Sequence, residues 1–185
     1  TPRLLLASGI ANQSGMVGRN LLHHTLVAAQ FWVDEPVNGQ VGYVASLFSR
    51  QFAETDVSRG FVNGFNFNCL TSTPSAGEMA TGWLSGTRAP WGAGHHDWFD
   101  ARFGHSIGLF AIGDDLPNPE NRVYLDETLR DADGIPVIAM HYEPGENDRR
   151  MMNYMLDRLA DVARVLKVDR EWLIHGIGEI EGPSP

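Results

Sequence analysis

The most regular hydrophobic pattern lies near the C-terminal end of the chain, over residues 146–168. Apolar side chains recur there at three- and four-residue spacing, and charged residues fall between them. The recurring positions are Met152, Met155, Leu156, Leu159, Val162, Ala163 and Leu166. This period predicts a long amphipathic helix with one buried face.

Runs rich in β-branched and aromatic residues predict strands within 25–34, 42–52, 60–70 and 105–115. Two further runs, 121–127 and 136–142, flank the polar turn Asp131-Ala132-Asp133-Gly134 and therefore form an antiparallel pair. We expect strands 105–113, 121–127 and 136–142 to share one mostly antiparallel sheet. The long helix would pack on that sheet through Met152, Met155, Leu159 and Leu166.

Shorter elements complete the pattern. Residues 2–8 read as a helix that Gly9 ends in the left-handed conformation, 11–19 as a loop, and 95–103 as one or two helical turns. The glycine- and proline-rich stretch 71–94 is loop-like. The predicted fold class is α+β, a mostly antiparallel sheet with a long covering helix.

Composition and charge narrow the function classes. The net charge of -9 over 185 residues, without a basic cluster, argues against nucleic acid as a partner, and no apolar run is long enough to span a membrane. The single cysteine, Cys69, excludes an internal disulfide and is interpreted as a small core residue rather than a nucleophile. A cytoplasmic or a periplasmic location is compatible with this composition.

The residues alone complete no catalytic motif. His95, His96 and His105 lack the spacing of a metal-binding helix, so a metal-dependent hydrolase is the weakest alternative. A second set could line a ligand cavity or simply belong to the core: Trp91, Trp98, Phe99 and Phe103. The chain has no Gly-x-Ser-x-Gly elbow, Walker loop or Gly-x-Gly-x-x-Gly fingerprint.

Three stretches resemble the glucose-methanol-choline (GMC) family of flavoprotein oxidoreductases. "TPRLLLASGI" resembles the second half of the family signature, although Ala11 replaces its final glycine. "VGRNLLHH" at 17–24 resembles the Val-Gly-x-Asn-Leu-x-Asp-His segment, with His23 in place of the aspartate. Residues 113–152 are similar to bacterial members related to the flavin subunit of gluconate and sorbitol dehydrogenases.

The resemblance implies that the chain is an excised piece of a longer protein. Residues 1–24 would be the C-terminal edge of an FAD-binding domain, and 25–185 an incomplete substrate-binding domain. Gly18, Asn20 and His24 match the segment beside the flavin, although a tight turn explains them nearly as well. The catalytic histidine would lie outside this chain. We interpret His175 as an accidental likeness, because Glu179 replaces the family's threonine.

The family's activity is FAD-dependent oxidation of CH–OH groups in alcohols, sugars or sugar acids, with hydride passing to the flavin and the proton to a histidine. Implied partners are the alcohol or sugar substrate, the missing FAD-binding domain and other dehydrogenase subunits. In the substrate domain, the sheet would form a floor and 71–94 would lie near the cavity mouth. The alternative from another class is a non-catalytic binding or interaction module.

Two further expectations follow from the resemblance. The isolated chain should bind no FAD, because it lacks the glycine-rich turn that cradles the pyrophosphate. Leu4, Leu5, Leu6 and Ile10 should form an apolar patch that the missing FAD domain would cover.

Overall fold

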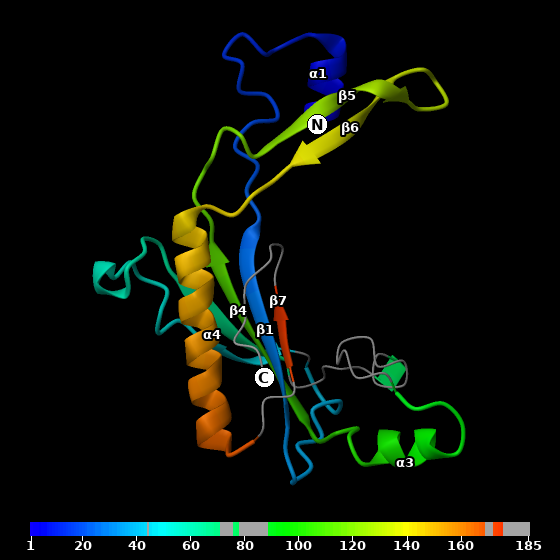
Figure 1. The fold of residues 1–185 in the computed structure, drawn as a ribbon, viewed down its shortest axis with the longest axis vertical. Helices are drawn as coiled ribbons and strands as arrows, with labels where there is room; N and C mark the ends of the chain where they lie inside the picture. Colours follow the sequence, from blue (N-terminus) through cyan, green and yellow to red (C-terminus); the bar gives the residue numbers. More distant parts are fainter. Residues whose placement is uncertain (44, 71–75, 78–88, 169–171, 176–185) are drawn as a thin grey trace. The chain divides into compact units, whose positions relative to one another are not determined.

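The structure is a computed structural model that describes residues 1–43, 45–70, 76–77, 89–168 and 172–175 (Figure 1). The chain divides into two compact units. Unit 1 combines Thr1–His23 with Asp115–Glu146, and unit 2 combines His24–Asp114 with Asn147–Pro185. Each unit is therefore assembled from two separate stretches of sequence.

Unit 2 is built on a five-stranded sheet in the order β2-β3-β4-β1-β7, with every neighbouring pair antiparallel. The strands are β1 (His24–Trp32), β2 (Ala45–Ser49), β3 (Phe65–Leu70), β4 (Ser106–Asp114) and β7 (Trp172–His175). The nine-residue strands β1 and β4 pair along their whole length, from His24 with Asp114 to Trp32 with Ser106. A short 3-10 helix, η1 (Val57–Arg59), and the helix α3 (Gly94–Asp100) lie in the connections.

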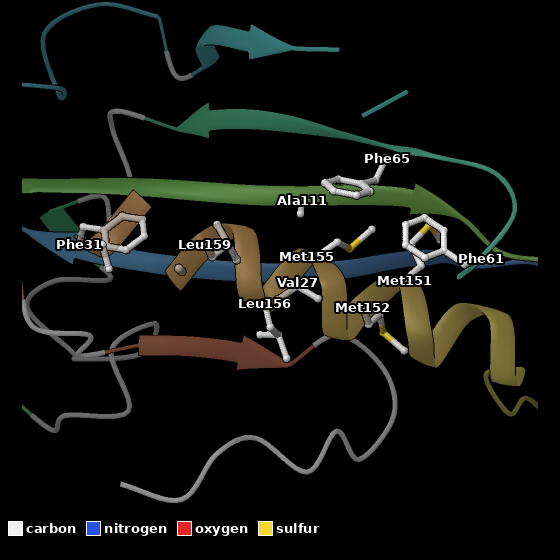
Figure 2. Close-up of a cluster of buried hydrophobic side chains, with 12 residues drawn as sticks. Val27, Phe31, Phe61, Phe65, Ala111, Met151, Met152, Met155, Leu156 and Leu159 are labelled. Atoms are coloured by element: carbon white, nitrogen blue, oxygen red, sulfur yellow. The ribbon is translucent and has the colours of Figure 1, made fainter. Parts of the chain in front are cut away.

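The helix α4 (Glu146–Leu166) packs against the sheet of unit 2 and forms its core (Figure 2). Alternation along the strands places Val27 of β1, Phe65 of β3 and Ala111 of β4 on the same sheet face. The helix therefore packs against side chains from three strands. The four helix residues predicted to pack here do so. Met152, Met155 and Leu159 are at most 2% exposed, and Leu166 is partly buried against the same cluster.

Unit 1 contains the hairpin of β5 (Arg122–Arg130) and β6 (Pro136–His141), with the helix α1 (Pro2–Ser8) lying against both strands. Arg3 of α1 forms an ion pair with Asp131, and its Nε donates to the Pro136 carbonyl at 3.0 Å. Gly9 ends α1 in the left-handed conformation, as predicted, with φ of 65°.

The prediction of one sheet for strands 105–113, 121–127 and 136–142 is wrong. The first becomes β4 of the five-stranded sheet, whereas β5 and β6 form a separate two-stranded sheet. Both edges of β4 are already paired, with β1 and β3, so no edge remains for the hairpin. The antiparallel pairing of β5 with β6, and the α+β class as a whole, are confirmed.

The apolar residues of the first ten positions are confirmed as incompletely covered. Leu4 is 67% exposed and Ile10 is 58% exposed, while Leu5 and Leu6 are partly buried. Within the described part of the chain, none of the helices has the length and apolarity that a membrane crossing requires.

Candidate functional site

Gly18 occupies a position in unit 1 that only glycine fits. Its φ is +84°, and a Cβ there would stand 2.2 Å from the carbonyl oxygen of Val123. That contact exists because the Val123 N–H donates to the Gly18 carbonyl at 2.7 Å, which draws the two backbones together. The turn thus has a backbone requirement for glycine that is independent of any ligand.

Asn20 continues the same turn in the left-handed conformation, with φ of 54°. The next residue, Leu21, donates its N–H to the Asn121 carbonyl at 2.7 Å. The Asn121 side chain is 2% exposed and makes a reciprocal pair of bonds with the Glu143 backbone, at 3.0 and 2.8 Å. Segment 18–21 is therefore fixed by backbone bonds to a buried polar centre.

Asp115 fixes the end of this segment, a role that the sequence analysis missed. One of its carboxylate oxygens accepts from the His23 N–H at 3.0 Å and from the Tyr142 hydroxyl at 2.8 Å. The rings of His23 and Tyr142 meet edge to face, with centroids 4.6 Å apart. Asp115 is only 7% exposed, and a carboxylate at the end of a predicted strand was the available signal.

The three residues predicted to lie beside the flavin do not fall in one unit. Gly18 and Asn20 belong to unit 1, where Gly18 and Leu21 make the backbone bonds described above. His24 is the first residue of β1 in unit 2, opposite Asp114, and its side chain is exposed.

The sheet face opposite α4 carries amide and apolar side chains within unit 2, of which Ala28 and Gln30 are buried while Asn66 and Asn68 are partly buried. Cross-strand register places three rows on it: Asn66-Ile112-Leu26, Asn68-Phe110-Ala28 and Leu70-Gly108-Gln30. Among the described residues, the buried side-chain oxygen of Asn66 has no hydrogen-bond partner. Amide groups spaced among apolar residues can bind a hydroxylated carbon chain.

The histidines do not converge on a metal. His95 and His96 have ring centroids 5.9 Å apart, and the His95 Nδ1 lies 3.1 Å from the Pro90 carbonyl oxygen. His105 contacts the Val33 carbonyl instead. Among the residues that the structure describes, no three His, Cys, Asp or Glu side chains form a metal-binding group.

The remaining residues that the sequence suggested as core or site residues lie in different environments. Cys69 is buried in β3, and burial raises the pKa of its thiol, which confirms the core interpretation. Trp91 is 97% exposed, so it is no core residue. His175 is the last residue of β7 and pairs with Val27 through the backbone. Most of the loop 71–94, and Glu179, lie outside the described residues.

Comparison with known proteins finds two dehydrogenases. The chain is 41% identical over 175 residues to 2-methyl-1,2-propanediol dehydrogenase of Mycolicibacterium austroafricanum, covering 90% of this chain and 32% of the relative. It is 28% identical over 176 residues to the fructose dehydrogenase large subunit of Gluconobacter japonicus, covering 90% and 31%. The chain spans about a third of the length of the curated relatives it matches. A scan against family models gives no match.

Proposed function

We propose that this chain is part of an FAD-dependent oxidoreductase of the GMC type that oxidises CH–OH groups. The observation that carries the proposal is the 41% identity to a diol dehydrogenase over nine-tenths of the chain. The second relative oxidises a sugar by its name, so both point to the same bond class. The motifs at 1–10 and 17–24 support the flavin as cofactor.

In this proposal, the chain alone is not expected to hold FAD. Its sequence carries no Gly-x-Gly-x-x-Gly fingerprint for the pyrophosphate, and the nearby Val123 carbonyl explains the glycine at position 18. We therefore assign no step of the reaction to the cofactor here. In the proposal, the segment 18–24 supplies an edge of the flavin site whose cradle lies elsewhere in the protein.

In the same proposal, unit 2 supplies the substrate floor. The sheet face opposite α4 offers Asn66 and Asn68 beside Phe110 and Ile112, so amides would bind substrate hydroxyls while apolar side chains exclude water. Asp115 would act as a positioning residue, because it holds the His23 backbone and hence the end of the flavin-edge segment.

The test is to purify the protein that carries this chain and record its absorbance before and after adding 2-methyl-1,2-propanediol or fructose. Bound flavin that bleaches with either compound is expected. A colourless protein that still binds either compound would favour the non-catalytic binding module, and chelator-sensitive hydrolysis would favour the metal alternative. Flavin that co-purifies stoichiometrically with these 185 residues alone would contradict the assignment of the cradle to another part of the protein.

The floor is tested by the substitution Asn68→Leu, with Asn153→Leu on the exposed side of α4 as the matched control. We expect a KM rise of about tenfold for the first variant, because one hydrogen bond to substrate is lost, and little change for the second. An unchanged KM in Asn68→Leu would remove this face from the substrate site.

A further inference from the structure

A small cavity in unit 2 opens beside the end of β1 and the start of β4. Its volume is about 300 Å³, and it is lined by Trp32, Val33, Asp34, Ala101, Arg102 and His105. The wall is fixed by backbone bonds, because the Val33 N–H donates to the His105 carbonyl at 2.8 Å. The cavity is therefore preformed, and its volume is at the lower end of the range for small-molecule sites.

Arg102 brings a preoriented positive charge to this cavity. Its guanidinium carbon lies 5.0 Å from the ring centroid of Trp98 and 5.9 Å from that of Trp32. The side chain is partly buried, and within the described ranges its guanidinium has neither an ion-pair partner nor a hydrogen-bond acceptor. A planar guanidinium held on indole faces without a partner suits a carboxylate, which it binds with two parallel bonds.

Two lining residues contribute hydrogen-bond acceptors. The His105 Nδ1 is 3.2 Å from the Val33 carbonyl, which can only accept, so Nδ1 carries the hydrogen and Nε2 of the neutral ring is an acceptor. Asp34 contributes a carboxylate that is exposed and not ion-paired with Arg102. These two acceptors suit the hydroxyl groups of a ligand.

We propose that this cavity binds a small hydroxycarboxylate, with Arg102 taking the carboxylate while Asp34 and His105 accept from its hydroxyls. A neutral alcohol would leave Arg102 unpaired. A simple fatty acid would leave both acceptors unused and would bring its negative charge near Asp34 without a compensating bond. The proposal is independent of the dehydrogenase function, since it uses no residue of the flavin edge or of the substrate floor.

The test is calorimetric titration of the protein that carries this chain with three four-carbon probes, threonate, butyrate and threitol. Threonate has both the carboxylate and the hydroxyls, butyrate only the carboxylate, and threitol only the hydroxyls. We expect threonate to bind about tenfold or more tightly than either of the others. Equal affinity for threonate and threitol, or for threonate and butyrate, would overturn the proposal.

Variants assign the binding to this cavity. Arg102→Met keeps the apolar stem and should raise the Kd for threonate about tenfold or more, while Arg164→Met, at a 74% exposed position on α4, should leave it unchanged. Arg102→Lys keeps the charge without the fork and should give an intermediate Kd, which decides the matter if Arg102→Met fails to fold. If threonate binds both Arg102 variants as tightly as the parent protein, its site lies elsewhere and the proposal is refuted.

Discussion

At the residue scale, single atoms determine how several residues of this chain contribute to stability. The missing Cβ of Gly18 permits a backbone contact that no other residue allows, and the hydroxyl of Thr25 is buried with no partner. The carboxylate of Asp131 accepts hydrogen bonds from the Arg3 side chain and from two backbone N–H groups. Each of these features changes stability by a known mechanism and can be tested by one substitution.

Gly18→Ala should destabilise unit 1 by about 3 kcal/mol or more. The alanine would have a strained left-handed φ and a Cβ placed 2.2 Å from the Val123 oxygen. Gly15→Ala is the matched control, since Gly15 has a φ of +69° but nothing within 4 Å of its Cβ position. Urea unfolding monitored in unit 1 should show a clearly larger loss for the first variant. Equal losses would mean that strain alone matters.

Thr25→Val should stabilise unit 2 by about 1 kcal/mol. The Thr25 side chain is 3% exposed, and its buried Oγ1 has no hydrogen-bond partner in the part of the chain that the structure describes, so an isosteric methyl removes an uncompensated polar group. Thermal unfolding measures the change, and Thr25→Ser, which keeps the hydroxyl and loses the methyl, should be destabilised. A less stable valine variant would show that the hydroxyl is satisfied in solution.

The ion pair of Asp131 should make the hairpin sensitive to acid. The Arg3 side chain, followed by the Ile135 N–H, lowers the pKa of the Asp131 carboxyl below its ordinary value of 3.8. This contribution to stability is present in full above the ordinary pKa and is lost as the pH falls through the lower folded-state pKa. Arg3→Met should therefore weaken the acid dependence of unfolding below about pH 5.

Asp131→Asn is the companion variant for that experiment, because it removes the titrating group itself. Asp131→Asn should flatten the dependence further than Arg3→Met, in which the Ile135 N–H still lowers the pKa of the Asp131 carboxyl. Asp126 and Asp56, whose carboxyl pKa values are also lowered, should titrate unchanged in both variants. An acid dependence identical to that of the parent protein in both variants would remove the pair from any role in stability.

At the scale of elements, α4 supplies six of the twelve buried residues in the apolar cluster of unit 2. Leu159→Ala should cost about 2 to 5 kcal/mol, because the side chain is 1% exposed and belongs to the buried cluster. Val165→Ala on the same helix is 80% exposed and should change stability by less than about 0.5 kcal/mol. Chemical unfolding of both variants gives the comparison, and similar losses would contradict this packing.

The helices and strands could be predicted from the sequence, but their grouping could not. Periodicity located α4 and the Asp131 turn located the hairpin, because both signals are local. Which strand pairs with β4 depends on contacts between distant segments. The hairpin strands have no fully buried residue, so their sequence pattern does not indicate that they form a sheet of their own. The candidate site was found by motif, whereas Asp115 and Arg102 depend on tertiary neighbours.

At the scale of the whole molecule, apolar burial is concentrated in one unit. Among the described residues, Pro144 is the one buried apolar residue of unit 1, whose other buried residues are Asp115 and Asn121, and all other buried aliphatic and aromatic side chains belong to unit 2. Unit 1 is therefore stabilised by backbone and polar contacts around its hairpin. We expect its amides to open more easily than those of the central strands.

Hydrogen exchange measured by mass spectrometry tests this difference. Peptides from β5 and β6 should exchange well before peptides from β1 and β4, each of which is paired on both sides. Slow exchange in the hairpin, comparable with that of β1, would show that unit 1 is protected by contacts beyond those within the unit itself.

The single thiol of these 185 residues can report on the sheet. Cys69 is the only cysteine of the 185 residues, it is buried in β3, and its pKa is raised. A thiol reagent therefore reacts with the native protein only as fast as β3 detaches from its neighbours. The rate of labelling measures the opening of that strand directly, and a cysteine introduced at the surface could carry a fluorophore with almost no background.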